Sequence, residues 1–232
     1  MIAVLVPVLD RPQRAAPLVE SLWRSSSLVD EVVFLVTPGD IDEQRAAART
    51  HARVEVVPFD LAGGDYARKI NYGVTITKSP WIFQAGDDIV FHPRWDEIAM
   101  ERAEATPSAA VIGTNDLGNP LVRRGMHSTH SLIRRAYIEE RGTIDEPGKA
   151  LHEGYWHCWV DNELIETAKH RRAYFPARRS IVEHMHWIWG DGEGGRKGRD
   201  DATYRRGQRH YNEDHALFRK RRVLWRGRLP GT

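Results

Sequence analysis

Cysteine is almost absent from this chain of 232 residues, since Cys158 is the only one. No internal disulfide can form, and a structural zinc site built on paired cysteines is excluded. A single thiol is compatible with a reducing compartment, so we expect a cytoplasmic protein.

Long apolar runs are missing as well. No stretch approaches the roughly 20 residues that a membrane-spanning helix needs. Met1 leads directly into the apolar segment 2–6, without the basic region that opens a signal peptide. A hydrophobic fraction of 41% is enough for a sizeable core, and 28% charged residues favour a soluble protein. We therefore expect one large α/β domain, or a domain with an extension.

The net charge of +2 is unevenly distributed. Residues 196–228 hold 12 Lys and Arg against four Asp and Glu, or +8, which leaves −6 for the remainder. Such a basic tail can contact nucleic acid, an anionic membrane face or a phosphate-bearing ligand. A solvated helical end would have the same composition, so charge alone does not decide between these roles.

Apolar runs alternate with helical spacing over the first 115 residues. We predict strands at residues 2–8, 31–36, 53–58, 81–85 and 110–113. We predict helices around residues 15–22 and at 42–50, 66–77 (with Asp65 as its N-cap) and 94–105. Strands that alternate with helices indicate βαβ units and a largely parallel sheet.

The second half is less regular. Residues 116–125 and 143–155 are predicted loops, the second of them mobile, and 190–198, with five glycines, is typical of a flexible flap. Short strands are predicted at 130–133 and 180–182. Helices are predicted at 135–141, 160–172 and 204–222, the last of them basic.

Two adjacent carboxylates, Asp87 and Asp88, follow Gly86 directly after the apolar run 81–85. Buried carboxylates are costly without a cation. A hard divalent ion takes oxygen ligands and commonly bridges to a substrate phosphate, and open α/β sheets bind ligands at the carboxyl ends of their strands. The pair therefore indicates a metal–diphosphate site at a sheet edge, although Asp is also a common turn former.

Two further groups of polar residues stand near predicted element ends. His184 and His186 flank Met185 after a strand, where residues two apart point to the same face. Asp161 and Glu163 open the helix 160–172, where negative charge is favourable. Each group also has a structural explanation, the histidines as packing residues and the acids as an N-cap with an acidic first turn.

Four motifs occur in a fixed order along the chain. They are Val6-Pro7-Val8 with Asp10, Ala67-Arg68-Lys69-Ile70-Asn71-Tyr72-Gly73, Gly86-Asp87-Asp88-Ile89 and Val160-Asp161-Asn162-Glu163-Leu164. This succession resembles the family 2 glycosyltransferases of the GT-A fold, and more narrowly their small bacterial and phage-encoded members. The resemblance covers residues 1–190 in outline and is most specific between residues 65 and 91.

The resemblance implies an α/β fold of the GT-A type, a single Rossmann-like domain whose mixed, mainly parallel central sheet is flanked by helices. Residues 1–115 would form the nucleotide-sugar-binding half, 116–195 the acceptor-binding half and 196–232 a basic C-terminal extension. The implied reaction moves a sugar from a nucleotide-diphosphate donor to an acceptor hydroxyl, with Mn²⁺ or Mg²⁺ as cofactor. The acceptor (a glycan, protein, lipid or small molecule) stays open, and a phage-encoded enzyme would work in the host cytoplasm.

The same resemblance implies roles for single residues. Asp88 would ligate the metal, and Asp87 would contact the donor ribose or a metal-bound water. Gly86 stands where many relatives carry a third Asp, so the division of labour between the two acids is open. A late histidine, either His184 or His186, would complete the metal shell. The donor would also contact five residues at the first strand and third helix, namely Pro7, Val8, Asp10, Lys69 and Asn71.

Asp161 matches the general base of the family, and the anomeric configuration would then invert. Val160 replaces the acid that usually precedes this base, so Glu163 is an alternative base. The acceptor would contact four ring-bearing side chains, namely His127, His130, Trp156 and Trp159. Trp187 and Trp189 beside the glycine-rich segment would form a lid tip, and four basic residues would then reach the diphosphate, namely Arg196, Lys197, Arg199 and Arg205.

Three other functions compete with this interpretation. A sugar nucleotidyltransferase opens with a glycine-rich loop after its first strand, whereas residues 9–12 contain no glycine. A nucleic-acid-binding protein would use the basic tail, but Asp87 and Asp88 would have no role in it. A degenerate glycosyltransferase would bind the donor without turnover. We therefore expect a metal-dependent, nucleotide-sugar glycosyltransferase and do not expect nucleic acid as a partner.

Overall fold

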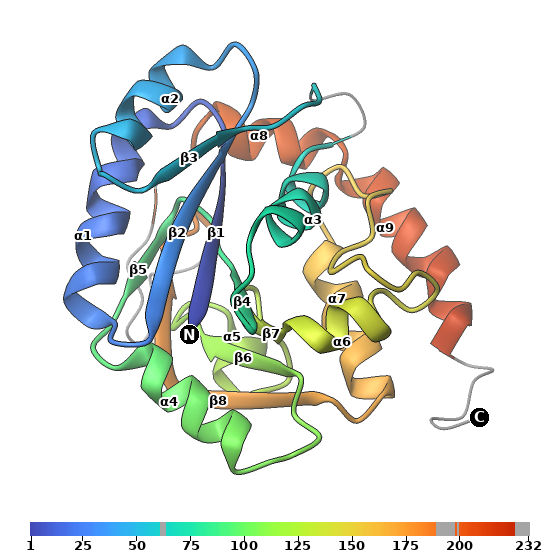
Figure 1. Ribbon diagram of the computed structural model, residues 1–232. Helices are drawn as coiled ribbons and strands as arrows, with labels where there is room; N and C mark the ends of the chain where they lie inside the picture. Colours follow the sequence, from blue (N-terminus) through green and yellow to red (C-terminus); the bar gives the residue numbers. More distant parts are fainter. Residues whose placement is uncertain (61–63, 189–197, 199, 226–232) are drawn as a thin grey trace.

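The computed structural model describes residues 1–60, 64–188, 198 and 200–225, which form a curled sheet with helices on both sides (Figure 1). The strands are β1 (Ile2–Val8), β2 (Val29–Val36), β3 (Arg53–Val56), β4 (Trp81–Gln84), β5 (Ile89–Phe91), β6 (Val111–Asn115), β7 (Ser131–Arg134) and β8 (Tyr174–His184). The helices are α1 (Ala15–Ser25), α2 (Ile41–Ala48), α3 (Tyr66–Ile76), α4 (Trp95–Glu104), α5 (Pro120–Arg123), α6 (Arg135–Glu140), α7 (Val160–His170), α8 (Ala202–Arg209) and α9 (Tyr211–Arg221). Single 3-10 turns form η1 (Pro12–Arg14) and η2 (Arg222–Trp225).

In the described part of the chain, eight strands form one sheet in the order β3-β2-β1-β4-β7-β6-β8-β5. β1 pairs in parallel with β2 and β4, and β2 pairs in parallel with β3. β7 runs antiparallel to both β4 and β6, while β6 and β8 are parallel and β5 runs antiparallel to β8. The predicted mixed, mainly parallel sheet is confirmed.

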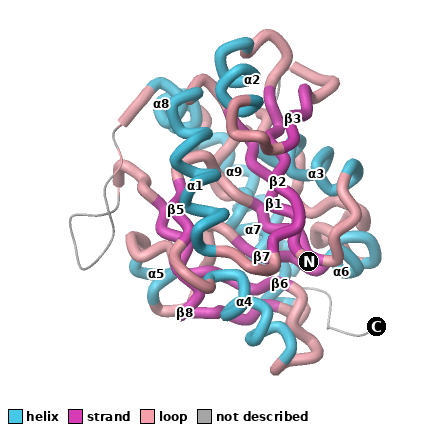
Figure 2. The backbone as a smooth tube through the Cα atoms, turned by 60° about the vertical axis from the view of Figure 1, so that its left-hand side comes forward, coloured by secondary structure: helices cyan, strands magenta, loops and turns pink. Residues whose placement is uncertain are grey.

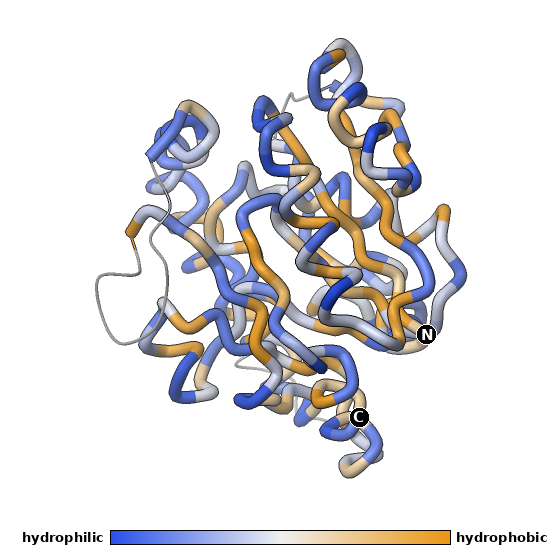
Figure 3. Tube along the Cα trace, turned by 90° about the vertical axis from the view of Figure 1, so that its left-hand side faces the viewer, coloured by the Kyte–Doolittle hydropathy of each residue, from blue (hydrophilic) through white to orange (hydrophobic). Residues whose placement is uncertain are grey.

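All seven residues of β1 are buried, and they divide between two apolar cores on opposite faces of the sheet. The even-numbered residues of β1 pack with Leu18 of α1 and Trp95 of α4, whereas Ala3 and Leu5 pack with α3 and α7. Successive strand residues point to opposite faces, so one apolar run serves two cores. Each fully buried Leu or Val contributes about 1.5–3 kcal/mol. Figure 2 shows α1 and α3 on opposite sides of the sheet, and Figure 3 shows apolar residues concentrated along the strands.

The last two strands of the sheet differ most from the prediction. β8 has 11 residues, whereas only residues 180–182 were predicted, because Pro176 and two adjacent arginines interrupt its apolar pattern. β5 has no counterpart among the predicted strands and is only three residues long. It pairs with the end of β8, so a long-range contact defines it more than its own sequence does.

The basic segment after residue 200 also differs from the single helix that the sequence predicts. It forms α8 and α9, with a break at His210, whose φ of −100° and ψ of 6° leave the helical region. The His210 ring stacks on Trp156 with ring centroids 4.0 Å apart, which holds the break against the body of the protein. The predicted loop 116–125 likewise contains the short helix α5.

Two loops complete the fold. Asp65 stands at the N-cap position of α3 but makes no capping hydrogen bond, because its carboxylate pairs with Lys69 at 2.8 Å. The predicted loop 143–155 has no helix or strand, and its residues Ala150, Leu151 and Tyr155 are buried in the core that contains Ala3 and Leu5. The predicted flap 190–198 lies outside the described residues apart from residue 198.

Among the described helices, none is both long and apolar enough to cross a membrane.

Candidate active site

Asp87 and Asp88 lie in the turn between β4 and β5, at one end of the sheet. Both carboxylates are buried, with exposed fractions of 7% and 5%. His184 is the last residue of β8 and pairs with Ile89, the residue after Asp88. The next backbone amide, that of Met185, donates to the Asp88 carbonyl at 2.9 Å. The pairing of two strands that are far apart in sequence therefore places His184 beside Asp88.

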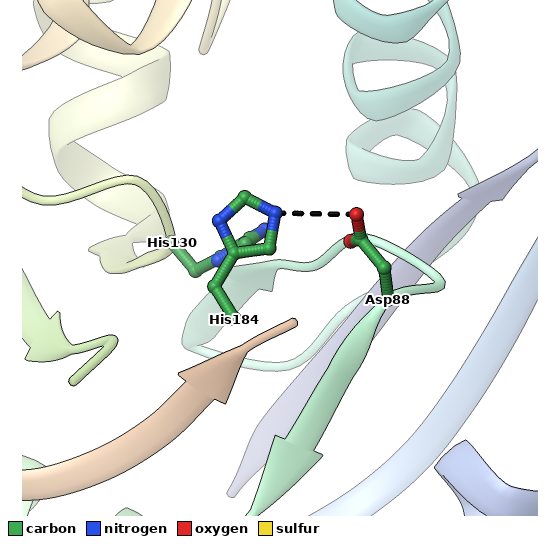
Figure 4. A group of neighbouring side chains, drawn as sticks. All are labelled: Asp88, His130 and His184. Atoms are coloured by element: carbon green, nitrogen blue, oxygen red, sulfur yellow. Dashed lines mark hydrogen bonds and ion pairs between the residues drawn. The ribbon is translucent and has the colours of Figure 1, made fainter. Parts of the chain in front are cut away.

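A carboxylate and two imidazoles meet at this point (Figure 4). His184 Nε2 lies 3.2 Å from Asp88 Oδ2. The His130 ring, from the loop before β7, stands edge-on to the His184 ring with centroids 4.8 Å apart. One ligand atom from each of the three residues lies within 4.8 Å of the others. We call Asp88, His130 and His184 the Asp88 cluster.

Burial and neighbouring charges shift the pKa values of the residues at this site in different directions. Burial would raise the pKa of Asp88, but His184 and Arg11 hold it well below its usual range. Burial and the nearby His184 charge lower the pKa of His130 to about 3, so its ring is neutral at physiological pH. Burial also raises the pKa of Asp87 to about 6, despite its arginine partner. Asp88 is therefore the more acidic member of the acid pair, next to a neutral imidazole that can bind a metal.

The Asp88 cluster fits a divalent cation. One carboxylate oxygen and two imidazole nitrogens form a donor set that binds divalent transition-metal ions, and the Nδ1 atoms of both histidines are buried without a hydrogen-bond partner in the described part of the chain. Gly86 keeps the place open, because a Cβ there would lie 2.8 Å from Asp88 Oδ1 and 3.2 Å from His130 Nε2. A third acid at position 86 would thus crowd the ligands, which gives its absence a physical reason.

Residues that the sequence did not single out surround the acid pair. Arg11 Nη1 donates to Asp87 Oδ1 at 2.8 Å and lies 3.8 Å from Asp88 Oδ2, and Arg14 lies 3.8 Å from the same oxygen. Tyr204 of α8 donates its hydroxyl hydrogen to Asp88, and Asp201 accepts from Arg11 at 2.9 Å. The position of Arg11 directly after β1 was the signal in the sequence. Nothing local could have indicated Tyr204 or Asp201.

Asp161 lies in the first turn of α7, where the helix dipole favours a negative charge. His127 Nε2 lies 3.2 Å from Asp161 Oδ2, and the Asn162 amide donates to Oδ1 at 2.8 Å. Burial would raise the pKa of Asp161, but these contacts lower it below its usual value. The charges of both Asp88 and Asp161 act on the His130 ring, so Asp161 lies near the Asp88 cluster.

Three of the predicted site residues make contacts that hold neighbouring segments of the fold together. Glu163 is buried and accepts from the Tyr155 hydroxyl at 2.7 Å and from Arg221 Nε at 2.7 Å. The Lys69 ammonium group is fully buried and donates to the Val8 carbonyl at 2.7 Å. Asn71 is bound to the backbone of Leu151 and to Glu153, so it anchors the loop 143–155.

The residues predicted at the first strand divide into two groups. Pro7 and Val8 are buried in β1 and present mainly their backbone at its carboxyl end. Asp10 follows the strand in a left-handed conformation with φ of 55°, and its exposed carboxylate accepts from Arg206 of α8 at 3.0 Å. The structure therefore places Asp10 next to the C-terminal extension.

The predicted aromatic and lid residues mostly pack on neighbouring elements. Trp156 stacks on His210, and Trp159 stacks on His215 and Phe218 of α9. The His186 ring lies edge-on to Tyr204 and outside the Asp88 cluster. Arg205 pairs with Asp200 at 3.1 Å, whereas Trp189, Arg196, Lys197 and Arg199 lie outside the described residues.

Solved structures share this fold at low sequence identity. The glucosyl-3-phosphoglycerate synthase of Mycobacterium tuberculosis, in complex with Mn²⁺, uridine diphosphate and phosphoglyceric acid, is 13% identical with a TM-score of 0.63, over 94% of this chain and 78% of that chain. A complex of the same synthase with Mg²⁺ and uridine diphosphate is 15% identical with a TM-score of 0.57, over 80% and 72%. The mannosyltransferase PcManGT of Pyrobaculum calidifontis, in complex with GDP-Man and Mn²⁺, is 11% identical with a TM-score of 0.60, over 80% and 57%. These likenesses confirm the predicted GT-A fold.

Sequence comparison identifies the family. No curated protein is a significant match to the chain. The family model described as Glycosyl transferase family 2 matches residues 3–167, which is well over half of the chain. The match includes the acid pair, His127, His130 and Asp161, although His184 lies beyond it. The chain therefore belongs to glycosyl transferase family 2 and is a nucleotide-sugar glycosyltransferase.

Proposed function

We propose that this enzyme transfers a sugar from a nucleoside diphosphate to an acceptor hydroxyl, with a divalent cation held at Asp88. The observation that carries the proposal is the Asp88 cluster, in which a carboxylate and two imidazoles meet at a sheet edge of a family 2 chain. Solved structures of similar fold contain Mn²⁺ or Mg²⁺ with uridine diphosphate, or Mn²⁺ with GDP-Man, which supports the same ligands here.

Asp88, His184 and His130 would hold the cation. The sequence offered His184 or His186 as the histidine ligand and assigned His130 to the acceptor. When bound, the cation would neutralise negative charge on the diphosphate leaving group. Asp87 accepts a hydrogen bond from Arg11, which occupies one of its oxygens. We therefore assign Asp87 to orienting the donor and not to ligating the metal. Arg11 and Arg14 face the acid pair, so their guanidinium groups are placed to contact phosphate oxygens next to it.

Asp161 is the group that would accept the proton of the acceptor hydroxyl. Its lowered pKa keeps it ionised at neutral pH, and the contact with His127 fixes its orientation. A single base that activates the acceptor on the face opposite the leaving group inverts the anomeric configuration. Glu163 is not available for this role because Arg221 and Tyr155 bind its carboxylate.

The C-terminal extension contributes to the donor side of the site. Tyr204 donates to the same Asp88 oxygen that His184 approaches, and Asp201 binds Arg11 and Arg14. A cation ligated by that oxygen requires Tyr204 to move aside. Residues 1–115 would therefore bind the donor together with α8, while residues 116–195 would present the base and the acceptor.

The first experiment measures the thermal stability of the protein with a panel of nucleoside diphosphates, with and without Mn²⁺. A ligand that binds only the native state raises the melting temperature. We expect one nucleoside diphosphate to stabilise the protein only when Mn²⁺ is present. Stabilisation that is independent of the metal would contradict the proposal.

The second experiment tests the base with Asp161→Asn. We expect unchanged stabilisation by donor and Mn²⁺, together with an about 10²–10⁴-fold slower release of nucleoside diphosphate from the sugar nucleotide, because only proton acceptance is lost. Glu166→Gln is the matched control, since this acid is exposed, lies on the same helix and pairs with exposed Lys169. Equal rates in the two variants would remove Asp161 from the role of base.

A further inference from the structure

A second concave site lies between α5 and β8, on the side of the sheet formed by β6 and β8. Its volume is about 680 Å³, which is within the range of small-molecule pockets. Among the described residues, four of the six that line it are arginines and none is acidic, these six being Asn115, Pro120, Arg123, Arg124, Arg178 and Arg179. We call it the arginine pocket.

An irregularity in β8 creates one wall of the pocket. The register between β6 and β8 moves from Gly113–Pro176 to Asn115–Ile181, so two steps along β6 correspond to five along β8. Arg178 and Arg179 fall within the additional residues and are both exposed, although neighbouring residues of a regular strand point to opposite faces. Bulges of this kind redirect side chains and are common next to active sites. The bulge therefore turns two adjacent arginines toward the same solvent-exposed side.

The α5 segment forms the opposite wall of the pocket. Hydrogen bonds from side chains to backbone carbonyls hold the bulge against α5 and β6. Arg178 Nε donates to the Arg123 carbonyl at 3.2 Å, and Asn115 Nδ2 donates to the Arg178 carbonyl at 3.0 Å. Gly125 ends the α5 turn with φ of 75°, and a Cβ there would lie 3.0 Å from Pro176. The close approach of the two segments thus needs glycine, and it holds the arginines around one space.

Three arginines of the pocket, unlike several arginines elsewhere on the surface, pair with no carboxylate in the described part of the chain. Arg53 and Arg94 each lie 2.6 Å from a glutamate oxygen. Within the described part of the chain, by contrast, no carboxylate pairs with Arg124, Arg178 or Arg179. Their terminal nitrogens are therefore available to a ligand. Guanidinium groups bind phosphate and carboxylate through paired hydrogen bonds, so the pocket suits an anion.

The pocket also lies next to the acceptor side of the active site. Asn115 lines it, and the following residue, Asp116, accepts a hydrogen bond from the His184 amide at 3.2 Å. The chain that leaves α5 reaches His127, the partner of Asp161, within four residues of Arg123. The donor-side residues Arg11 and Asp87 come instead from the ends of β1 and β4.

We propose that the arginine pocket binds an anionic group of the acceptor, either a phosphate ester or a carboxylate, while the hydroxyl of the acceptor extends toward Asp161. This inference rests on the proposed transferase function. The pocket is bounded on two sides and has a limited volume, which fits a compact anion better than a long polyanion such as nucleic acid. The acceptor class is therefore a phosphorylated or carboxylated molecule.

The test compares two variants with the same change in net charge. Arg178→Gln/Arg179→Gln removes the bulge arginines, and Arg24→Gln/Arg45→Gln removes two arginines that are 75% and 69% exposed elsewhere. Inorganic phosphate, glucose 6-phosphate and citrate are titrated by calorimetry at constant ionic strength. The same titrations are repeated with saturating Mn²⁺ and the best nucleoside diphosphate of the panel.

We expect at least about tenfold weaker binding of phosphate or carboxylate anions to Arg178→Gln/Arg179→Gln, and native affinity in the control variant. The preferred probe distinguishes a phosphate from a carboxylate acceptor. Binding should persist with saturating nucleotide, because the two ligands have separate sites. Equal binding by both variants, competition with the nucleotide, or binding of single-stranded DNA alone would overturn the proposal. Failure of the donor proposal appears separately, as absent stabilisation of the native protein by nucleotide and Mn²⁺.

Discussion

Two groups of acids and histidines in this protein have nearly the same composition but different surroundings. The Asp88 cluster lies at the sheet edge, and a second group, the Asp145 cluster, consists of Asp145, His152 and Glu163. In both, one ligand atom from each residue lies within 4.8 Å of the others. Both also contain buried imidazole Nδ1 atoms without a partner, so these features do not distinguish them.

An arginine makes the difference. Arg221 of α9 donates to Asp145 at 2.6 and 3.0 Å and to Glu163 at 2.7 and 2.8 Å. The nearest guanidinium nitrogens to Asp88 Oδ2 are 3.8 Å away, and the hydrogen bonds of that oxygen come from His184 and Tyr204. The chain thus supplies its own cation to the Asp145 cluster, which ties α9 to the body of the protein. The Asp88 cluster still has donor atoms for a metal.

The largest expected effect comes from exchanging an acid in each cluster. Asp88→Asn should abolish stabilisation by Mn²⁺ with nucleotide and slow transfer at least about 10³-fold, because a carboxylate ligand is lost. Asp145→Asn should keep both properties and lower only the melting temperature. Thermal shift and release of nucleoside diphosphate measure the two effects. If Asp145→Asn loses stabilisation by Mn²⁺ with nucleotide, the Asp145 cluster takes part in metal binding and the distinction between the two clusters is wrong.

A somewhat smaller effect is expected on stability when the internal cation is removed. Arg221→Met leaves buried Glu163 without its cationic partner, with only the Tyr155 hydroxyl still bound, and should lower the free energy of unfolding by about 3–5 kcal/mol. Arg221→Met/Glu163→Gln should recover part of the loss, because no buried charge then remains. Urea unfolding in EDTA gives all three values.

The same variant also tests whether Arg221 occupies the position of a metal ion in the Asp145 cluster. With the guanidinium gone, Asp145, His152 and Glu163 retain ligand atoms for a metal, so Zn²⁺ should raise the melting temperature of Arg221→Met but not of Arg221→Met/Glu163→Gln. If Zn²⁺ has no effect on Arg221→Met, the arginine is not standing in the place of a cation.

The donor half of the fold could be predicted because its signals are local. β1 is a continuous apolar run, and α1 and α3 present apolar residues at helical spacing. β8 lacks such a signal, since Pro176, Arg178 and Arg179 interrupt it and its pairing with β6 and β5 depends on distant contacts. The arginine pocket was missed for the same reason.

The candidate site was predictable only in part. Asp88 and His184 stand at predicted strand ends, so their meeting follows from the fold. The proposal of Asp161 over Glu163 as the base uses contacts that the sequence does not show, because residues two apart on a helix differ in direction by about 200° and face different surroundings. Tyr204 and Arg221 lie 116 and 58 residues from the acids they bind, a separation that no local pattern encodes.

The smallest expected effect on stability concerns Glu43, another buried acid. It tests whether a hydrogen bond to one of the two carboxylate oxygens is enough to keep a buried carboxylate charged. Glu43 is fully buried, and its Oε2 accepts from the Arg11 amide at 2.8 Å while Oε1 has no partner. Burial raises the pKa of Glu43 to about 7, an effect that the Arg11 hydrogen bond only partly offsets. The folded protein therefore binds this proton more tightly than the unfolded chain does.

Stability from this group is consequently present at low pH and is lost as pH rises through about 7. Glu43→Gln mimics the protonated form, so the variant and the native protein should be almost equally stable at pH 5. At pH 8 the variant should be more stable by about 1–3 kcal/mol, since the native protein must then bury a charge. Urea unfolding in EDTA across this range measures the difference. A difference that stays constant with pH would show that Glu43 is charged throughout, and that one amide hydrogen bond suffices where Glu163 uses an arginine.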